Sequence, residues 1–132
     1  MTTDKQQVVL LLVEDDPAMR SLLCDELWDL GYRLIEAADG DEALKQVMDG
    51  ASPDLILTDL RMPAGGLDYI ARLRRFAPKT PIILMTAFGD AKTKAQAHTF
   101  GITEYFDKPV RIGELKAAIE RILPRGEQSL NP

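Results

Sequence analysis

Cysteine is almost missing from this sequence: Cys24 is the only one, and histidine also occurs once, as His98. A lone cysteine excludes an internal disulfide, and the two residues together are too few ligands for a zinc site. Cys24 falls among apolar positions of a predicted helix, so we expect it to pack, reduced, inside a cytoplasmic protein. Aromatic residues make up only 6% of the chain, and we expect Trp28 and Phe100 to serve in packing rather than in a functional site.

Long hydrophobic runs are also missing. The longest covers residues 8–13 and is followed at once by acidic residues, whereas a helix that crosses a bilayer needs about 20 apolar residues. We therefore expect neither a membrane span nor an export signal. An excess of positive charge is lacking too. The net charge of −5 disfavours direct binding to nucleic acid, because such binding comes from Lys and Arg neutralising phosphates.

What remains is the composition of an ordinary globular domain. Of the 132 residues, 45% are hydrophobic and 28% are charged, which is enough to bury one core without disulfides. We predict a single domain over residues 8–123. A polar lead of residues 1–7 precedes it, and residues 124–132 form a polar tail or the start of a linker.

Short apolar runs alternate with helical patterns along the chain. Runs of strand length, continuous as in strands buried on both faces, occur near residues 8–13, 34–35, 55–58, 81–85 and 104–106. Apolar residues at helical spacing follow each run, beginning near residues 17, 40, 67, 91 and 112. Five strands that alternate with five helices predict a doubly wound α/β domain with a parallel sheet.

Charged and hydroxyl side chains follow four of the predicted strands. The carboxyl ends of parallel strands lie at one edge of the sheet, where doubly wound proteins bind their ligands. Each such residue taken singly has an ordinary explanation, such as a helix cap or a solvated lysine. The joint pattern instead predicts one site that contains Glu14, Asp15, Asp16, Asp59, Thr86 and Lys108.

The residue types in this set indicate phosphoryl chemistry. Carboxylates from two neighbouring strand ends would repel one another unless a cation lies between them, and Mg²⁺ suits a site with few carboxylates and room for phosphate oxygens. Lys108 and Thr86 supply a positive charge and a hydroxyl donor for such oxygens. Asp59 is then a plausible phosphoryl acceptor.

The stretches LLVEDDPAMR, LILTDLRMP, IILMTA and YFDKP, in this order and spacing, resemble the response-regulator receiver family of two-component signalling. The resemblance covers nearly the whole chain. It implies a flavodoxin-like fold, similar to that of chemotaxis regulators, with strand order 2-1-3-4-5. It also implies a signalling switch rather than an enzyme, in which a sensor histidine kinase phosphorylates Asp59 and the domain slowly loses the phosphoryl group by itself.

The same resemblance assigns roles to the other site residues. Glu14, Asp15, Asp59 and the main-chain carbonyl of Arg61 are implied ligands of Mg²⁺. Thr86 and Lys108 are implied to contact the phosphoryl group.

Three further features bear on the resemblance to the receiver family. Tyr105 matches the switch aromatic of the family, which turns inward on activation, although an ordinary half-buried strand tyrosine is an equal alternative. Asp16 lies outside the family's acidic pair, and with Pro17 after it we expect a helix N-cap. The Lys108–Pro109 bond resembles one that is cis in the family.

One departure concerns the loop after the third strand. The stretch at residues 62–67 is one residue shorter than is usual in receivers, which leaves the conformation at residues 64–66 and any partner contact there undetermined.

Two other functions compete with the switch. An aspartyl-phosphate phosphatase or phosphotransferase commonly has a second aspartate two residues after the first, but Arg61 stands there. A pseudo-receiver would merely bind a partner, and the complete acidic, hydroxyl and lysine set disfavours it. We expect a monomer or a phosphorylation-dependent dimer that acts through a separate partner, or a receiver that is part of a longer regulator.

Overall fold

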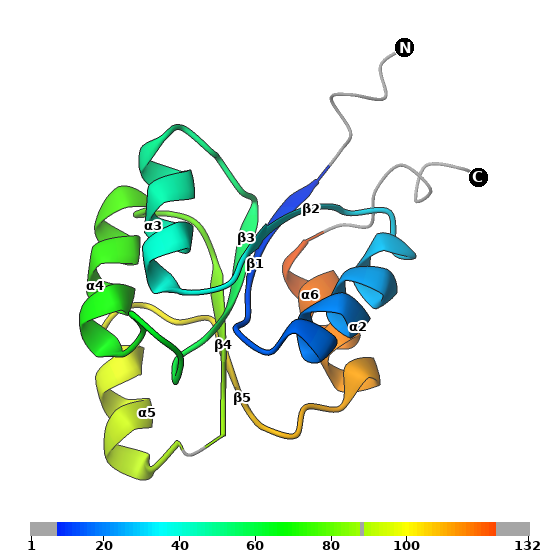
Figure 1. Ribbon diagram of the computed structural model, residues 1–132. Helices are drawn as coiled ribbons and strands as arrows, with labels where there is room; N and C mark the ends of the chain where they lie inside the picture. Colours follow the sequence, from blue (N-terminus) through cyan, green and yellow to red (C-terminus); the bar gives the residue numbers. More distant parts are fainter. Residues whose placement is uncertain (1–7, 88, 124–132) are drawn as a thin grey trace.

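A computed structural model describes residues 8–87 and 89–123 (Figure 1). The predicted lead at 1–7 and tail at 124–132 lie outside the described residues. The strands are β1 (Val9–Val13), β2 (Arg33–Ala37), β3 (Leu55–Asp59), β4 (Ile82–Thr86) and β5 (Glu104–Asp107). The helices are α2 (Pro17–Trp28), α3 (Gly40–Met48), α4 (Leu67–Phe76), α5 (Ala91–His98) and α6 (Ile112–Ile122).

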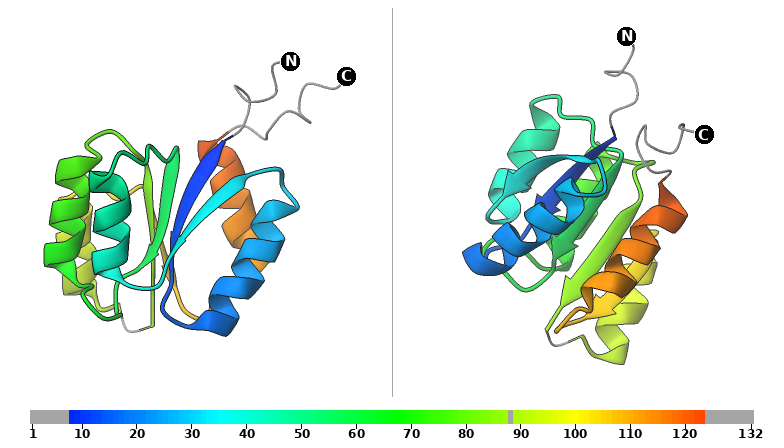
Figure 2. Two further views of the ribbon diagram at one scale, coloured as in Figure 1. Left: turned by 45° about the horizontal axis from the view of Figure 1, so that its top comes forward. Right: turned by 90° about the vertical axis from the view of Figure 1, so that its right-hand side faces the viewer.

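The strands form one parallel sheet in the order β2-β1-β3-β4-β5, which confirms the predicted flavodoxin-like topology. Helices α2 and α6 cover one face of the sheet, and α3, α4 and α5 cover the other (Figures 1 and 2). None of the helices in the described ranges is long and apolar enough to cross a membrane.

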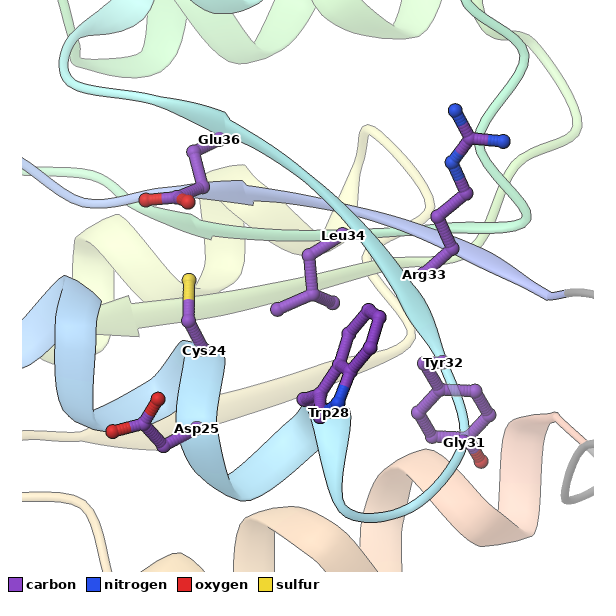
Figure 3. A pocket seen from close by; sticks show the side chains of 8 residues that line it. All are labelled: Cys24, Asp25, Trp28, Gly31, Tyr32, Arg33, Leu34 and Glu36. Carbon is purple, nitrogen blue, oxygen red and sulfur yellow. The ribbon is translucent and has the colours of Figure 1, made fainter.

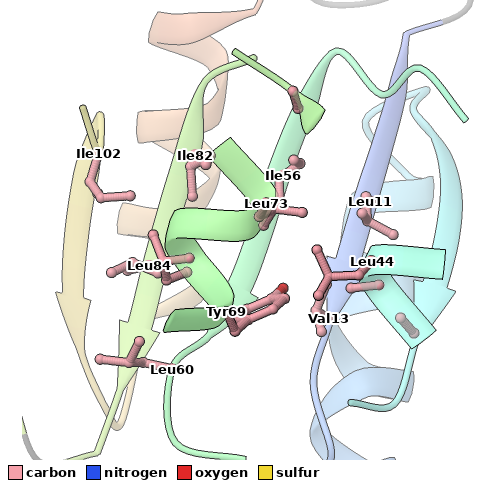
Figure 4. Close-up of a cluster of buried hydrophobic side chains, with 14 of the residues drawn as sticks. Leu11, Val13, Leu44, Ile56, Leu60, Tyr69, Leu73, Ile82, Leu84 and Ile102 are labelled. Atoms are coloured by element: carbon pink, nitrogen blue, oxygen red, sulfur yellow. The ribbon is translucent and has the colours of Figure 1, made fainter. Parts of the chain in front are cut away.

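The core lies in two layers, one on each face of the sheet. Along β1, Leu11 and Val13 face the layer under α3, α4 and α5 (Figure 4), whereas Leu10 and Leu12 belong to the layer under α2 and α6. This alternation follows from the period of two in a strand. Every residue of β3 and β4 is buried, which explains why residues 55–57 and 82–85 of these strands are continuous apolar runs in the sequence.

The helix ends follow the signals in the sequence. The side chain of Asp16 accepts hydrogen bonds from the main-chain N–H groups of Ala18 and Met19, so Asp16 is the predicted N-cap of α2. Asp39 caps α3 in the same way, through the N–H of Glu42. Each cap holds the first turn of a helix that begins next to the carboxyl edge of the sheet.

The short loop between β3 and α4 is a compact structure of its own. Ala64 has a φ of 57°, in the left-handed region that non-glycine residues rarely adopt. The N–H of Gly40 donates to the carbonyl of Pro63 at 3.1 Å, and a side chain at Gly40 would collide with the carbonyl of Ala64. The loop is therefore packed directly against the first residue of α3.

Two of the packing predictions are confirmed and one is wrong. Phe100 and Cys24 are partly buried against the two core layers, as expected. Trp28 is instead 67% exposed, because it lies about 100° around α2 from the buried Leu27. It lines an open groove between α2 and β2, together with Leu34 and Cys24 (Figure 3).

Candidate functional site

The carboxyl ends of four strands bring the predicted site residues to one edge, the lower edge of the sheet in Figure 1. Glu14 and Asp15 directly follow β1, Asp59 is the last residue of β3, and Thr86 is the last residue of β4. Lys108 directly follows β5. The bond between Lys108 and Pro109 is cis, as predicted.

Lys108 connects the two buried acids of the site. Its Nζ donates to Glu14 Oε1 and to Asp59 Oδ2, each at 2.7 Å. Glu14 is 0% exposed and Asp59 is 3% exposed, so a single ammonium group offsets the charge of two carboxylates that water does not reach.

The same contacts explain the protonation of the site. Burial raises the pKa of Glu14, and the hydrogen bond from Lys108 only partly opposes this effect. Burial alone would lower the pKa of Lys108, but the hydrogen bonds to Asp59 and Glu14 outweigh it and raise that pKa. Lys108 is therefore a fixed positive charge at neutral pH.

The carboxylate of Asp59 is held on both oxygens. Oδ1 accepts hydrogen bonds from the main-chain N–H groups of Leu60, at 2.7 Å, and Arg61, at 3.1 Å. Oδ2 accepts from Lys108. This arrangement fixes the side chain of Asp59 in one orientation, with its carboxylate beside the acidic pair Glu14 and Asp15.

The acidic residues fit a divalent cation. One carboxylate oxygen from each of Glu14, Asp15 and Asp59 lies within 4.8 Å of the others. Asp15 is exposed, so a hydrated ion can reach the set from solvent. Oxygen ligands with retained waters are what Mg²⁺ prefers in proteins. Asp16 is not in this cluster, because its side chain caps α2.

Thr86 and Tyr105 lie together beyond this cluster. The Oγ1 of Thr86 and the hydroxyl of Tyr105 are both buried and make no hydrogen bond within the described residues. A side chain at Gly89 would collide with the hydroxyl of Tyr105 and crowd the methyl group of Thr86. Tyr105 therefore turns inward against the loop after β4, and the ammonium of Lys94 lies 4.9 Å from its ring centre.

Sequence reasoning missed two sets of residues behind the site. Arg20 donates to the carbonyl of Glu14 at 2.6 Å and pairs with Glu36, so it anchors the acidic pair to β2. Thr58 and Tyr69 form a buried hydroxyl pair behind Asp59. The signal in the sequence for this pair was the hydroxyl of Thr58, which directly follows the apolar residues 55–57 of the buried strand.

Comparison with known proteins agrees with this geometry. Residues 10–120 match the family described as "Response regulator receiver domain". The phosphate regulon transcriptional regulatory protein PhoB of Escherichia coli (strain K12) is 33% identical over 119 residues, which are 88% of this chain and 52% of that protein. The chain thus spans about half the length of the curated relatives it matches.

Among the solved structures that resemble this one, two hold a metal ion or a phosphorylated aspartic acid. A Burkholderia pseudomallei response regulator with a phosphorylated aspartic acid, a calcium ion and citrate has a TM-score of 0.77 and 28% identity, over 85% of this chain and 66% of that one. The receiver domain of the sensor histidine kinase PA1611 from Pseudomonas aeruginosa PAO1, with a magnesium ion coordinated in its active-site cleft, has a TM-score of 0.76 and 30% identity. The match covers 87% of this chain and 96% of that one.

Proposed function

This chain belongs to the response-regulator receiver family of two-component signalling, and from that membership we propose that it is a switch in which a sensor histidine kinase phosphorylates Asp59. The observation that carries the proposal is the contact of Asp59 with Lys108 at 2.7 Å beside the acidic pair Glu14 and Asp15. A receiver is a phosphoacceptor rather than a classical enzyme.

The residues around Asp59 suit transfer from a phosphohistidine. A carboxylate oxygen of Asp59 forms a bond to phosphorus while the P–N bond breaks, and the imidazole of the kinase keeps the electron pair and takes up a proton. Lys108 compensates negative charge on the transferred group. The hydroxyl of Thr86 donates a hydrogen bond to one of its oxygens.

Mg²⁺ is the proposed cofactor. Glu14, Asp15, Asp59 and the main-chain carbonyl of Arg61 would hold it. The ion neutralises charge on phosphoryl oxygens when it is bound. The magnesium ion in the related Pseudomonas receiver supports this assignment.

The signal would leave through α5, β5 and α6. Phosphorylation replaces a carboxylate with a group that carries about −1.5 to −2 charges, which Thr86 and Lys108 can attract. Tyr105, against the loop that follows Thr86, is the proposed switch residue. A downstream partner or an output domain would respond to this change. The chain would act on it as a monomer or as a phosphorylation-dependent dimer.

Labelling by a small phosphodonor tests the acceptor. We expect a stoichiometric label on wild-type protein in the presence of Mg²⁺ and none when the metal is chelated. Asp59→Asn should lose the label, whereas the matched change Asp68→Asn, at an exposed aspartate of α4, should keep it. An undiminished label in Asp59→Asn, or a label on His98, would refute the assignment. Continuous turnover of a phosphate ester would instead favour a phosphatase.

A further inference from the structure

Two buried hydroxyl groups lie directly behind the acceptor aspartate. The Oγ1 of Thr58 is 2.9 Å from the hydroxyl of Tyr69 and 2.8 Å from the main-chain carbonyl oxygen of Asp59. Thr58 is 0% exposed and Tyr69 is 3% exposed. Thr58 comes from β3 and Tyr69, labelled in Figure 4, from the first turn of α4, so the pair joins the strand that bears the acceptor to the next helix.

The direction of these hydrogen bonds is fixed by chemistry. A carbonyl oxygen can only accept, so Thr58 must donate its single hydroxyl proton to Asp59. Tyr69 must then donate to the oxygen of Thr58. Burial raises the pKa of Tyr69, which keeps its phenol protonated as this direction requires. The result is a one-way relay from Tyr69 through Thr58 to the carbonyl of Asp59.

The relay ends on the peptide group that holds the acceptor. The carbonyl of Asp59 and the N–H of Leu60 belong to one amide plane. That N–H donates to Asp59 Oδ1 at 2.7 Å and also to the carbonyl of Met85 at 3.1 Å. A hydrogen bond accepted by an amide carbonyl polarises the amide and strengthens the donor on its other end.

We propose that Thr58 and Tyr69 are positioning residues for phosphoryl transfer, because their relay fixes and polarises the Asp59–Leu60 peptide that orients the acceptor carboxylate. This inference rests on the proposed function of Asp59. Neither hydroxyl touches the transferred group. They act through the N–H of Leu60, which holds Oδ1 of Asp59.

A purely structural role for Thr58 and Tyr69 predicts a different outcome. Two hydroxyls that only satisfy each other inside the core would affect folding stability but not the rate of transfer. Removing one leaves the other buried without its partner, and removing both can recover much of the lost stability. If the pair positions the acceptor, the double variant should therefore regain folding stability while its rate of phosphoryl transfer stays low.

Five variants make the test. Thr58→Val and Tyr69→Phe each remove one hydroxyl with little change of shape, and their combination removes both. Thr58→Ser keeps the hydroxyl. Ile70→Val, next to Tyr69 on α4 and fully buried, trims the core without touching the relay and serves as the control. Phosphorylation by acetyl phosphate is followed at saturating Mg²⁺, with Mg²⁺ affinity and thermal unfolding measured separately.

We expect Thr58→Val to slow phosphorylation about fivefold, the factor that matches the loss of one ordinary hydrogen bond. Tyr69→Phe keeps the hydrogen bond from Thr58 to the carbonyl of Asp59, so it should slow phosphorylation less. The double variant should be no slower than Thr58→Val, since that change alone removes the donor to the carbonyl of Asp59, while its unfolding temperature recovers relative to Thr58→Val. Thr58→Ser and Ile70→Val should keep the wild-type rate. The amide proton of Leu60 should shift upfield in NMR spectra of Thr58→Val, Tyr69→Phe and the double variant, but not in those of Thr58→Ser or Ile70→Val.

Wild-type rates in Thr58→Val and Tyr69→Phe, or a rate that follows unfolding temperature across all variants including Ile70→Val, would overturn the proposal. If Thr58→Val does not fold, Tyr69→Phe and Thr58→Ser still decide the outcome. Absence of any label on wild-type Asp59 would overturn the proposed function itself. A labelled wild type with unaffected variants would overturn only the positioning role.

Discussion

Replacing Lys108 with methionine removes the cation that two buried carboxylates share. Glu14 is 0% exposed, and Asp59 is 3% exposed, so neither can regain its hydration without local opening. Loss of one partner from a buried ion pair costs about 3–5 kcal/mol, and the 20% exposure of the lysine side chain lets water offset part of that cost. In the absence of divalent metal, we expect the free energy of unfolding to fall by about 2–4 kcal/mol at pH 7.5.

The loss should depend on pH with a defined sign. Burial already raises the pKa of Glu14 above its ordinary value of 4.5, and removal of the Lys108 hydrogen bond would raise it further. A folded-state pKa above the unfolded value means that the folded protein binds more protons. The variant should therefore regain stability as the pH falls from 7.5 through the raised pKa toward 4.5.

Urea denaturation at pH 7.5 and pH 5, with a chelator and then with excess Mg²⁺, measures these effects. Lys45→Met is the matched control, because Lys45 and Asp49 form an exposed pair whose loss should cost at most about 0.5 kcal/mol. Added Mg²⁺ should restore part of the stability of the Lys108 variant. A loss no larger than that of Lys45→Met, or one that is equal at both pH values, would refute the reasoning.

Four shorter predictions follow from single residues. Asp15→Ala should abolish Mg²⁺ binding in a fluorescence titration, whereas Asp16→Ala should keep it and lose about 0.5–2 kcal/mol of stability with its helix cap. Gly40→Ala should cost about 1–3 kcal/mol in denaturant unfolding, because its new methyl group meets main-chain atoms of the loop before α4. Burial, with a neighbouring acidic side chain, raises the pKa of Cys24 to about 11, so its alkylation at pH 8 should be about a hundredfold slower than that of a thiol with the ordinary value of 9.0. Thr86→Ala should still be phosphorylated but should lose most of the phosphorylation-dependent change in amide exchange over α5, and an unaltered response would mean that the signal leaves by another face.

The sequence was sufficient for the fold because its signals are local and agree with one another. Most of β3 and β4 consists of apolar runs, residues 55–57 and 82–85, as is typical of strands buried on both faces. The predicted site follows from the same logic. Since the carboxyl ends of parallel strands share one edge, Asp59 and Lys108 had to come together although 49 positions separate them.

What the sequence could not predict depends on side-chain direction. Trp28 adjoins the buried Leu27, yet one step around the helix points it to solvent. The contact between Thr58 and Tyr69 needs the angle at which α4 crosses β3, which no spacing encodes. The shortened loop at residues 64–66 likewise takes its conformation from contact with Gly40, a residue of another helix.

Of the five helices in the described residues, the one with the fewest buried residues lies where the proposed switch needs movement. Among the described residues of α5, only Ala97 is buried, whereas α4 buries Tyr69, Ile70 and Leu73. Helices with few buried apolar contacts open at low free-energy cost. A change in the loop after Thr86 would therefore move α5 more easily than α4. The Thr58–Tyr69 relay ties the acceptor to the better buried helix α4, so the same arrangement can hold Asp59 in place for phosphoryl transfer while α5 responds.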